Sequence, residues 1–552
     1  MLALRPGGRR IVILTISSIL FTVLSNPCWP AQEEFARTHS MCGWIPMELL
    51  DRPTTLESGV GSIHEKVTTS SSEAQQFYDQ GLAFLQSYVW IEAARSFHQA
   101  LRYDPHMAMA YVGLSYAYSP IDFAAALAAL NQAQSLYEGL SDRERRRIQI
   151  RGLQLQAMAD TSKVERELAF RDALDDALGT YPDDIVFLLL RGVAAEPSPF
   201  ADGQGCDMGG APYFEKALVL DPSNFAAQHF LTHCYENVGD VQHALPHALA
   251  YAESAPDIPH AQHMCGHVLR RMGRMEEAIA RFERADDLER AYLAKENIPS
   301  SLDWHYAHNV NLLASSYQYL GQMKNAEKYF RQANSLKAYT DYDSFNRKDW
   351  PEFLLNRKRY PEALAAARAM TEKPSPLARA VGHLLMGDAL VCLGRSQEAK
   401  VELHQANGII QTLAPSDVPT IQPYLEGLEG ALLLEAGDPA HAHQVFQRVI
   451  LRIYAANGPD AWTQGLFQLE FLFDLACRAK DWELAGQLAR AMNARAPDYA
   501  GTHYALAVVA QHNEQGETAQ REFAAAESFW NKADPDLPEL ATIHRGLAAQ
   551  SR

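Results

Sequence analysis

A small residue recurs along most of this 552-residue chain at intervals that one pair of helices can span. When successive amphipathic segments are aligned at the start of their second helix, the same position holds an alanine each time. These residues are Ala244, Ala278, Ala326, Ala363, Ala399, Ala442, Ala485 and Ala519. A large aromatic residue follows each of four of these alanines, at Phe282, Phe330, Phe446 and Phe523. The shortest intervals are the first and the last, and they match the period of roughly 34 residues that is typical of helical pairs burying their apolar faces by stacking. We therefore predict an all-α chain that grows by adding pairs, with loop insertions in the longer intervals.

The first unit, from Phe77 to Pro105, indicates the packing role of each position. Small residues let two helices approach closely, large ones fill the space between them, and proline ends the unit. The pattern is carried by Gly81, Phe84, Ala93, Phe97, Ala100 and Pro105. This order resembles the tetratricopeptide repeat (TPR). The resemblance implies a right-handed α-solenoid of about ten to eleven helical pairs, in which first helices line a concave groove and second helices form the outer face.

The repeats divide the chain into segments. The segment of N-terminal repeats includes a degenerate region, with a possible helix start at Ser141, and a Gly- and Pro-rich loop between Glu196 and Gly210 that forbids a continuous helix. The expected segments are a signal peptide over 1–31, an irregular lead over 32–71, N-terminal repeats over 72–222, His-rich repeats over 223–335, C-terminal repeats over 336–535 and a tail over 536–552.

The amino terminus has the order of a secretory signal. Arg5, Arg9 and Arg10 precede an apolar run over 11–24, and a polar, Pro-bearing segment follows. The run is short for a membrane span, so we expect cleavage, export to the bacterial periplasm or the extracellular space, and no stable span afterwards. The cleavage point is left open. Cys28 would suit lipidation, but Pro27 before it fits such processing poorly, so we do not expect a lipid anchor.

Charge and motifs exclude several functions. Lysine and arginine number 49 against 67 acidic residues, a net charge of −18, which opposes binding to nucleic acid. The sequence holds no dinucleotide-binding, Walker A, nucleophile-elbow or H-E-x-x-H motif. Its cysteines are widely spaced and form no CxxC. Cys234 and Cys265 lie beside the histidines described next, where they could be soft ligands, a disulfide or, our preferred interpretation, buried packing residues.

Histidine is concentrated in the middle of the chain. Nine of the 20 histidines fall between Phe225 and Asn309, where an even spread would place about three. Two H-x3-H pairs, HFLTH and HMCGH, are offset by the length of one minimal repeat, and a loop is expected to add His305 and His308 in DWHYAHN. A third pair with the same spacing, His243 and His247, falls on a second helix and is expected at the outer surface.

The repeat alignment predicts that these imidazoles converge. It places His229 and His263 at repeat position 5, His233 and His267 at position 9, and His260 and His308 at position 2; in TPR proteins these positions line the groove, as the resemblance implies. Adjacent helices lie roughly 8 to 10 Å apart, close enough for such side chains to share one small ligand. Imidazole suits Cu, Zn and Fe. The predicted transition-metal ligands are His229, His233, His263, His267 and His308, with His260, His305 and Glu236 as further or supporting ligands.

Two functions follow from this arrangement. The first is an exported scaffold whose His-lined concave groove binds a protein or peptide partner, with histidines that contact the partner or satisfy their neighbours. The second is a metalloprotein or metalloenzyme with a His-bound Cu, Fe or Zn, in which Glu236 is the candidate base. Of these two functions, the sequence favours the scaffold first and the metal site second. The sequence assigns neither a reaction nor an oligomeric state.

Several stretches extend the resemblance beyond the repeat. They resemble a group of exported bacterial TPR proteins over most of residues 41–335, and they are MCGWIPMELLDRP, VTTSSSEAQQFYDQGL, HFLTHCYEN, PHAQHMCGHVLRRMGR and DWHYAHN. The similarity includes the histidines of the predicted site and implies no particular reaction.

Overall fold

The computed structural model describes residues 45–549, apart from 197, 201, 339–340 and 457–459. Within these residues helices are the only regular secondary structure, so the all-α prediction is confirmed. The predicted signal peptide, Cys28 and any cleavage point lie outside the described residues. Among the helices described, none is long and apolar enough to cross a membrane.

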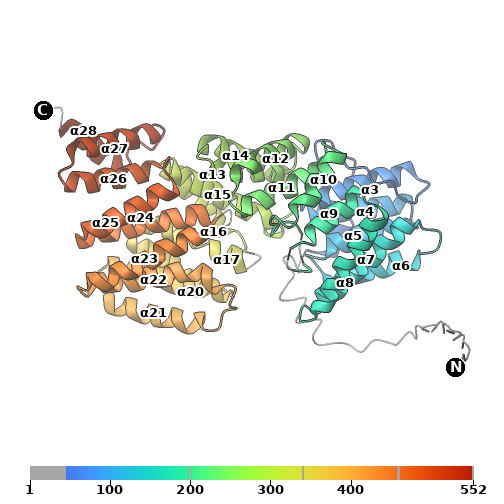
Figure 1. Ribbon diagram of the computed structural model, residues 1–552, viewed down its shortest axis with the longest axis horizontal. Helices are drawn as coiled ribbons and strands as arrows, with labels where there is room; N and C mark the ends of the chain where they lie inside the picture. The colour runs from blue at the N-terminus through green and yellow to red at the C-terminus, as the bar shows by residue number, and fades with distance from the viewer. Residues whose placement is uncertain (1–44, 197, 201, 339–340, 457–459, 550–552) are drawn as a thin grey trace, which may run out of the picture.

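The N-terminal part, blue to blue-green in Figure 1, is a stack of helices in which chain neighbours pack against each other. The expected irregular lead holds one short helix, α2. The degenerate region is helical from α6 to α9, and the predicted Ser141 start is a capping box with Glu144. The helices are α2 (Met47–Leu50), α3 (Ser72–Leu85), α4 (Trp90–Tyr103), α5 (Ala108–Tyr118), α6 (Phe123–Ser135), α7 (Asp142–Ala159), α8 (Val164–Thr180), α9 (Ile185–Val193) and α10 (Ala211–Leu220).

The middle part consists of three helical pairs that carry the histidines. In each pair the first helix holds the imidazoles of the predicted site and the second packs against it. The pairs are α11 (Phe225–Asn237) with α12 (Val241–Ser254), α13 (Pro259–Arg271) with α14 (Met275–Glu296), and α15 (Trp304–Tyr319) with α16 (Met323–Ser335), and the short 3-10 helix η1 (Ser300–Leu302) precedes α15.

The C-terminal part, yellow to red in Figure 1, continues the stack and turns back toward the middle pairs. Asn346 donates to Asp460 at 3.3 Å, and the Trp530 indole donates to the Tyr319 carbonyl at 3.3 Å. The expected tail contains a helix, α28. The helices are α17 (Asp341–Asn346), α18 (Asp349–Asn356), α19 (Tyr360–Thr371), α20 (Pro376–Cys392), α21 (Ser396–Ile410), α22 (Val418–Glu435), α23 (Pro439–Ala455), α24 (Ala461–Ala479), α25 (Trp482–Arg495), α26 (Ala500–His512), α27 (Gly516–Phe529) and α28 (Pro538–Ala549).

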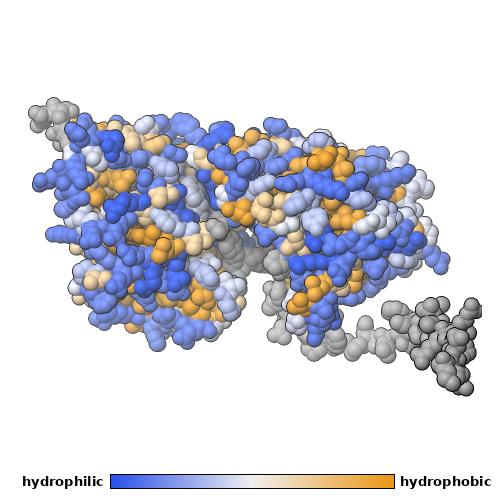
Figure 2. All heavy atoms as spheres, in the orientation of Figure 1, coloured by the Kyte–Doolittle hydropathy of each residue, from blue (hydrophilic) through white to orange (hydrophobic). Residues whose placement is uncertain are grey.

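The recurring small and large residues form the core between helices. All eight alanines of the repeat series are buried, and the four phenylalanines that follow them are at most 1% exposed. At several first helices a glycine brings the backbone against such a ring. A Cβ added at Gly81 would lie 2.6 Å from Phe97, and one added at Gly266 would lie 2.7 Å from Phe282. This packing confirms the α-solenoid prediction. The face in Figure 2 is mostly hydrophilic, with scattered hydrophobic groups.

The close approach of Gly266 to Phe282 predicts a measurable cost for a methyl group there. Gly266→Ala should lower the free energy of unfolding by about 1–3 kcal/mol, since the buried ring has no room to retreat. The matched control is Gly408→Ala, in the exposed last turn of α21, where an added Cβ meets nothing within 4 Å. That change should raise stability by about 0.5–1 kcal/mol because alanine restricts the unfolded chain more than glycine. Urea unfolding followed by circular dichroism measures both, and equal stability of the two variants would contradict this packing.

Candidate metal centre

The candidate site lies where α11, α13 and α15 stack side by side. Asn224 caps α11 by accepting from the Ala227 amide at 3.0 Å. Asp303 caps α15 by accepting from the His305 and Tyr306 amides. Side chains four apart on a helix share one face, so each H-x3-H pair presents two imidazoles in the same direction. His305 and His308 lie in the first turns of α15, so the expected loop is wrong: the Asp303 cap starts the helix before them.

The first group of imidazoles comes from α11 and α13. His229 Nε2 is 3.1 Å from His233 Nε2 and 3.0 Å from His260 Nε2. One nitrogen from each of the three side chains lies within 4.8 Å of the other two. Three nitrogens at this spacing, all from buried side chains, can surround one ion. We call these three residues the first triad.

The second group comes from α13 and α15. His263 Nε2 is 2.8 Å from His267 Nε2, and His308 completes a set whose ligand atoms also lie within 4.8 Å of one another. His263, His267 and His308 are called the second triad. The sequence prediction placed all six residues on one cavity; the structure resolves them into two adjacent groups of three.

His305 lies between the two triads. Its ring centroid is 5.1 Å from that of His260 and 4.4 Å from that of His263, and the His260 and His263 rings are 6.0 Å apart. His305 Nε2 is buried, and it has no hydrogen-bond partner among the described residues. The two triads therefore form one continuous cluster, with a seventh imidazole nitrogen available at their junction.

Hydrogen-bond partners at Nδ1 orient four of these rings, and an oxygen that can only accept fixes the protonation of two of them, His229 and His263. Three of the partners are the Gln86 carbonyl for His229, Glu236 for His267 and Glu289 for His305, at 2.7, 3.2 and 3.0 Å. The fourth is the Asn309 side-chain oxygen for His263, at 2.9 Å. The Asn309 amide nitrogen donates to a backbone carbonyl, so its oxygen faces the imidazole.

A proton on Nδ1 leaves the lone pair of a neutral imidazole on Nε2. In the second triad, an ionised Glu236 accepts from His267 Nδ1, and the Nε2 lone pairs of His263 and His267 then face each other at 2.8 Å, which is repulsive unless a cation lies between them. Metal-ligating histidines in proteins usually have this arrangement, with the other ring nitrogen donating to a carbonyl or carboxylate.

Burial makes a proton a poor candidate for that cation. His229, His260, His263 and His267 are at most 5% exposed, and burial lowers the pKa of each well below 6.5. Burial also lowers the pKa of His233 and of His305 to about 4. Near neutral pH these rings are uncharged, which is the protonation state that metal coordination requires of an imidazole.

Buried carboxylates surround the cluster without entering either triad. Burial raises the pKa of Glu236 to about 7, with Arg271 opposing this, and raises the pKa of Glu289 well above its usual range. On the far side, Asp460 at the start of α24 comes within 4.0 Å of His308 and 3.9 Å of Arg270. These acids can balance positive charge in the cluster while leaving coordination to nitrogen.

Two sequence interpretations need correction. Cys234 forms a disulfide with Cys206, which ties the Gly- and Pro-rich loop to α11, whereas Cys265 is buried and free. Cys234 is therefore neither a soft ligand nor a packing thiol.

The histidines are also not open to a groove, because the loop from Gln86 to Tyr88 covers the first triad and Asp460 approaches the second. The third H-x3-H pair lies apart, with His243 71% exposed and His247 stacked on Tyr235.

Several residues of the site have no sequence signal. Tyr88 places its ring 4.8 Å from that of His229 and 5.1 Å from that of His260, and it adopts a left-handed backbone with φ 59°. Gln86, Asn309 and Glu289 contribute as hydrogen-bond partners of imidazole Nδ1 atoms. Asn309 and Glu289 could have been found by asking which polar residues of the repeats face the histidine helices.

Comparison with known proteins identifies the repeats. A family model described as "Tetratricopeptide repeat" matches residues 259–292 and 307–340, which include α13 and most of α15. The chain contains tetratricopeptide repeats. The matched TPR segments contain all three residues of the second triad, so these histidines lie on the repeat helices themselves.

Solved structures have low similarity to this chain. A monomeric mutant of IFIT1 with Gppp-AAAA is 13% identical, with a TM-score of 0.33 over 84% of this chain and 91% of that chain. The human IFIT1 dimer with m7Gppp-AAAA is 13% identical, with a TM-score of 0.34 over 88% and 92%. The APC/C hetero-tetramer Cut9-Hcn1 is 12% identical, with a TM-score of 0.31 over 86% and 91%. The search of curated proteins gave no match to this chain.

The buried imidazoles predict that the free energy of unfolding of the metal-free protein falls as the pH is lowered. Because the folded-state pKa of His233 is about 4 and its ordinary value is 6.5, the unfolded chain binds the proton first as pH falls. Relative to a His233→Gln variant, the wild type should lose about 2 kcal/mol of stability between pH 7.5 and pH 5. Urea unfolding of both chelator-treated proteins at the two pH values measures this change. A difference that does not vary with pH would contradict the burial of a neutral His233.

Proposed function

We propose that this TPR protein is a metalloprotein in which each histidine triad binds one transition-metal ion. The observation that carries the proposal is the set of buried, neutral imidazoles whose Nε2 atoms face one another at 2.8–3.1 Å. A protein that had only to fill this space could use apolar side chains, because unpaired buried nitrogens cost free energy. Three nitrogen ligands for each ion suit Cu, Zn or Fe.

Coordination by three side chains leaves a position at each ion for water, oxygen or a substrate. Two adjacent ions can also act together on one bound molecule. Of the surrounding groups, Glu236 is best placed to orient His267, since its Oε1 accepts from the imidazole Nδ1. Glu236 is therefore a positioning residue in this proposal. The sequence made it the candidate base, and the proposal assigns the role of base to no described side chain.

A second proposed function is the scaffold that we placed first from the sequence. The repeat type supports it, because TPR proteins typically bind proteins or peptides. Burial of the six triad residues argues against a partner that contacts them directly, so such a partner would have to bind elsewhere on the solenoid. Export to the periplasm or the extracellular space, and the identity of any partner, remain predictions from the sequence.

Metal analysis tests the metalloprotein proposal. Chelator-treated protein is incubated separately with Cu, Zn and Fe, freed of excess ion and analysed by inductively coupled plasma mass spectrometry. The wild type should retain about two ions per chain of at least one metal, since each triad holds one. His233→Ala should lose the ion of the first triad and His267→Ala the ion of the second, so each variant should retain about one ion per chain. The double variant should retain none.

The chain offers a matched control for this experiment. His243 and His247 have the same H-x3-H spacing but do not belong to either triad, so replacing both by alanine should leave the metal content unchanged. Far-UV circular dichroism verifies that each variant is folded. Wild-type protein that retains none of the three metals, or triad variants that retain as much as the control, would refute the proposal.

A further inference from the structure

A second feature of the molecule points to an organic ligand. Beside the first triad, residues of α3, α4, α5, α7, α8, α9 and α11 and of the segments that precede α3 and follow α9 line a cavity of about 560 Å³. Such a volume lies within the range of small-molecule pockets, about 300–1,000 Å³. His64, whose side chain is 66% exposed, lines the cavity and marks its opening to solvent.

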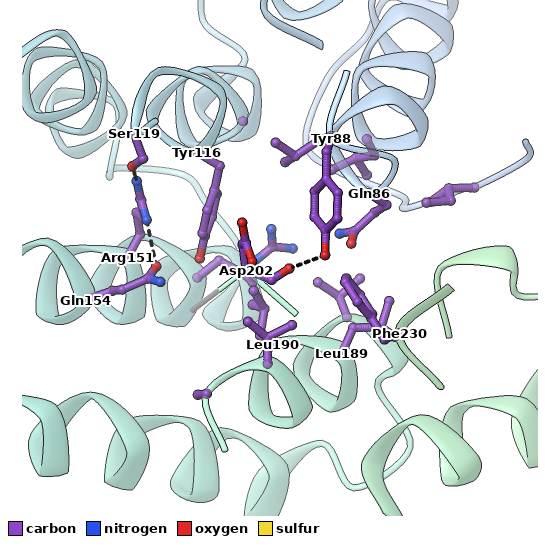
Figure 3. A pocket seen from close by; sticks show the side chains of 18 of the residues that line it. Gln86, Tyr88, Tyr116, Ser119, Arg151, Gln154, Leu189, Leu190, Asp202 and Phe230 are labelled. Atoms are coloured by element: carbon purple, nitrogen blue, oxygen red, sulfur yellow. Dashed lines mark hydrogen bonds between the residues drawn. The ribbon is translucent and has the colours of Figure 1, made fainter. Parts of the chain in front are cut away.

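Most of the cavity wall is apolar. Figure 3 shows Leu189, Leu190 and Phe230 around Tyr88 at one end and Arg151 with Tyr116 at the other. The Tyr88 hydroxyl donates to the Asp202 carbonyl at 2.9 Å, so the ring is held in place as part of the wall. A ligand that fits this space would have an apolar body and a polar group directed at Arg151.

Arg151 carries a buried positive charge without a partner of opposite sign. It is 1% exposed, and no carboxylate of the described residues lies within 4.0 Å of it. Its acceptors are all neutral: the Ser115 hydroxyl and carbonyl, the Ser119 hydroxyl and the Gln154 side-chain oxygen. Burial lowers the pKa of Arg151 to about 10, with Tyr116 opposing this. A buried charge is costly unless it is paired, so this position favours an anion.

The neighbouring arginines already have carboxylate partners. Arg143 and Arg147 contact Glu65, and Arg143 also pairs with Asp184, so two cations meet two carboxylates there. The Asp202 carboxylate, which also lines the cavity, accepts from Gln204 and not from Arg151. Arg151 therefore lacks one carboxylate partner, which a ligand with a single carboxylate would supply.

Three hydrogen-bond donors at the cavity wall lack acceptors. Four of the five N–H groups of Arg151 are used, which leaves one on Nη1. The buried Tyr116 hydroxyl and the buried Arg147 Nε have no partner among the described residues, and both side chains line the cavity. Carboxylate oxygens accept such hydrogen bonds, and charge strengthens them.

From these observations we propose that the cavity binds an apolar organic monocarboxylate, with its carboxylate at Arg151 and its apolar body along Leu189, Leu190 and Phe230. The proposal does not rest on the metal proposal, because every group that would recognise the carboxylate lies outside the histidine cluster. Tyr88 lines this cavity and also contacts His229 and His260, so a bound carboxylate would lie one side chain away from the first triad.

Calorimetric titration tests this site with the chelator-treated full chain. Dodecanoate serves as the probe, and dodecanol has the same chain length without the charge. The wild type should bind one dodecanoate at least tenfold more tightly than dodecanol. Arg151→Gln should weaken dodecanoate binding at least tenfold and leave dodecanol binding unchanged, which removes the preference. Leu190→Trp, which fills the cavity, should abolish the binding of both.

The control is Arg145→Gln on the same helix, α7, because Arg145 donates to the Leu140 carbonyl and lies outside the cavity lining. It should bind dodecanoate like the wild type. If Arg151→Gln does not fold, Arg151→Lys should retain a preference for the anion because it keeps the charge. Failure of the wild type to bind dodecanoate, equal affinity for dodecanol, or an unchanged preference in Arg151→Gln would overturn the proposal. Metal content in the same preparations is measured separately, so either proposal can fail alone.

Discussion

The arrangement of the middle repeats depends on one electrostatic constraint: neutral imidazole nitrogens with their lone pairs directed at one another in a buried space. The His263 and His267 Nε2 atoms face each other at 2.8 Å while their Nδ1 protons are held by Asn309 and Glu236. Turning either ring would break a buried hydrogen bond, and protonating either would place charge in a poorly solvated interior. A shared cation satisfies both nitrogens at once, which is why the metal proposal follows from geometry as well as from composition.

The repeat architecture supplies this geometry at little structural cost. A helical pair repeated at the minimal interval returns the same face to the same place, so two H-x3-H pairs become neighbours without a special loop. Close packing through glycine and phenylalanine brings α13 against α14 and so fixes the position of the imidazoles on α13. The positioning groups, in contrast, do not recur from repeat to repeat: Gln86 holds His229 of the first triad, whereas Asn309 and Glu236 hold residues of the second.

The sequence predicted the all-α solenoid and the convergence of the six triad histidines because both depend on spacing along the chain. It could not predict the division into two triads, since that depends on how α11, α13 and α15 are offset in space. The assignment of His305 and His308 to a loop was wrong because the Asp303 cap was not recognised. The partner of Cys234 was missed because Cys206 is brought near only by the folding of a Gly- and Pro-rich loop. The cavity around Arg151 had no signal, since an unpaired charge is visible only when every neighbour is known.

The approach of distant segments to the histidines has a consequence for the order of events during biosynthesis. The Gln86 carbonyl holds His229, and Asp460 comes close to His308, so the groups around the cluster span most of the polypeptide. A ribosome-bound chain that has emerged only as far as α16 contains all six triad histidines and lacks Asp460. Its second triad is still uncovered on that side. Under the metal proposal, ions would therefore reach the second triad more easily before α24 is in place, and the closing C-terminal helices would slow exchange once the last repeats have packed.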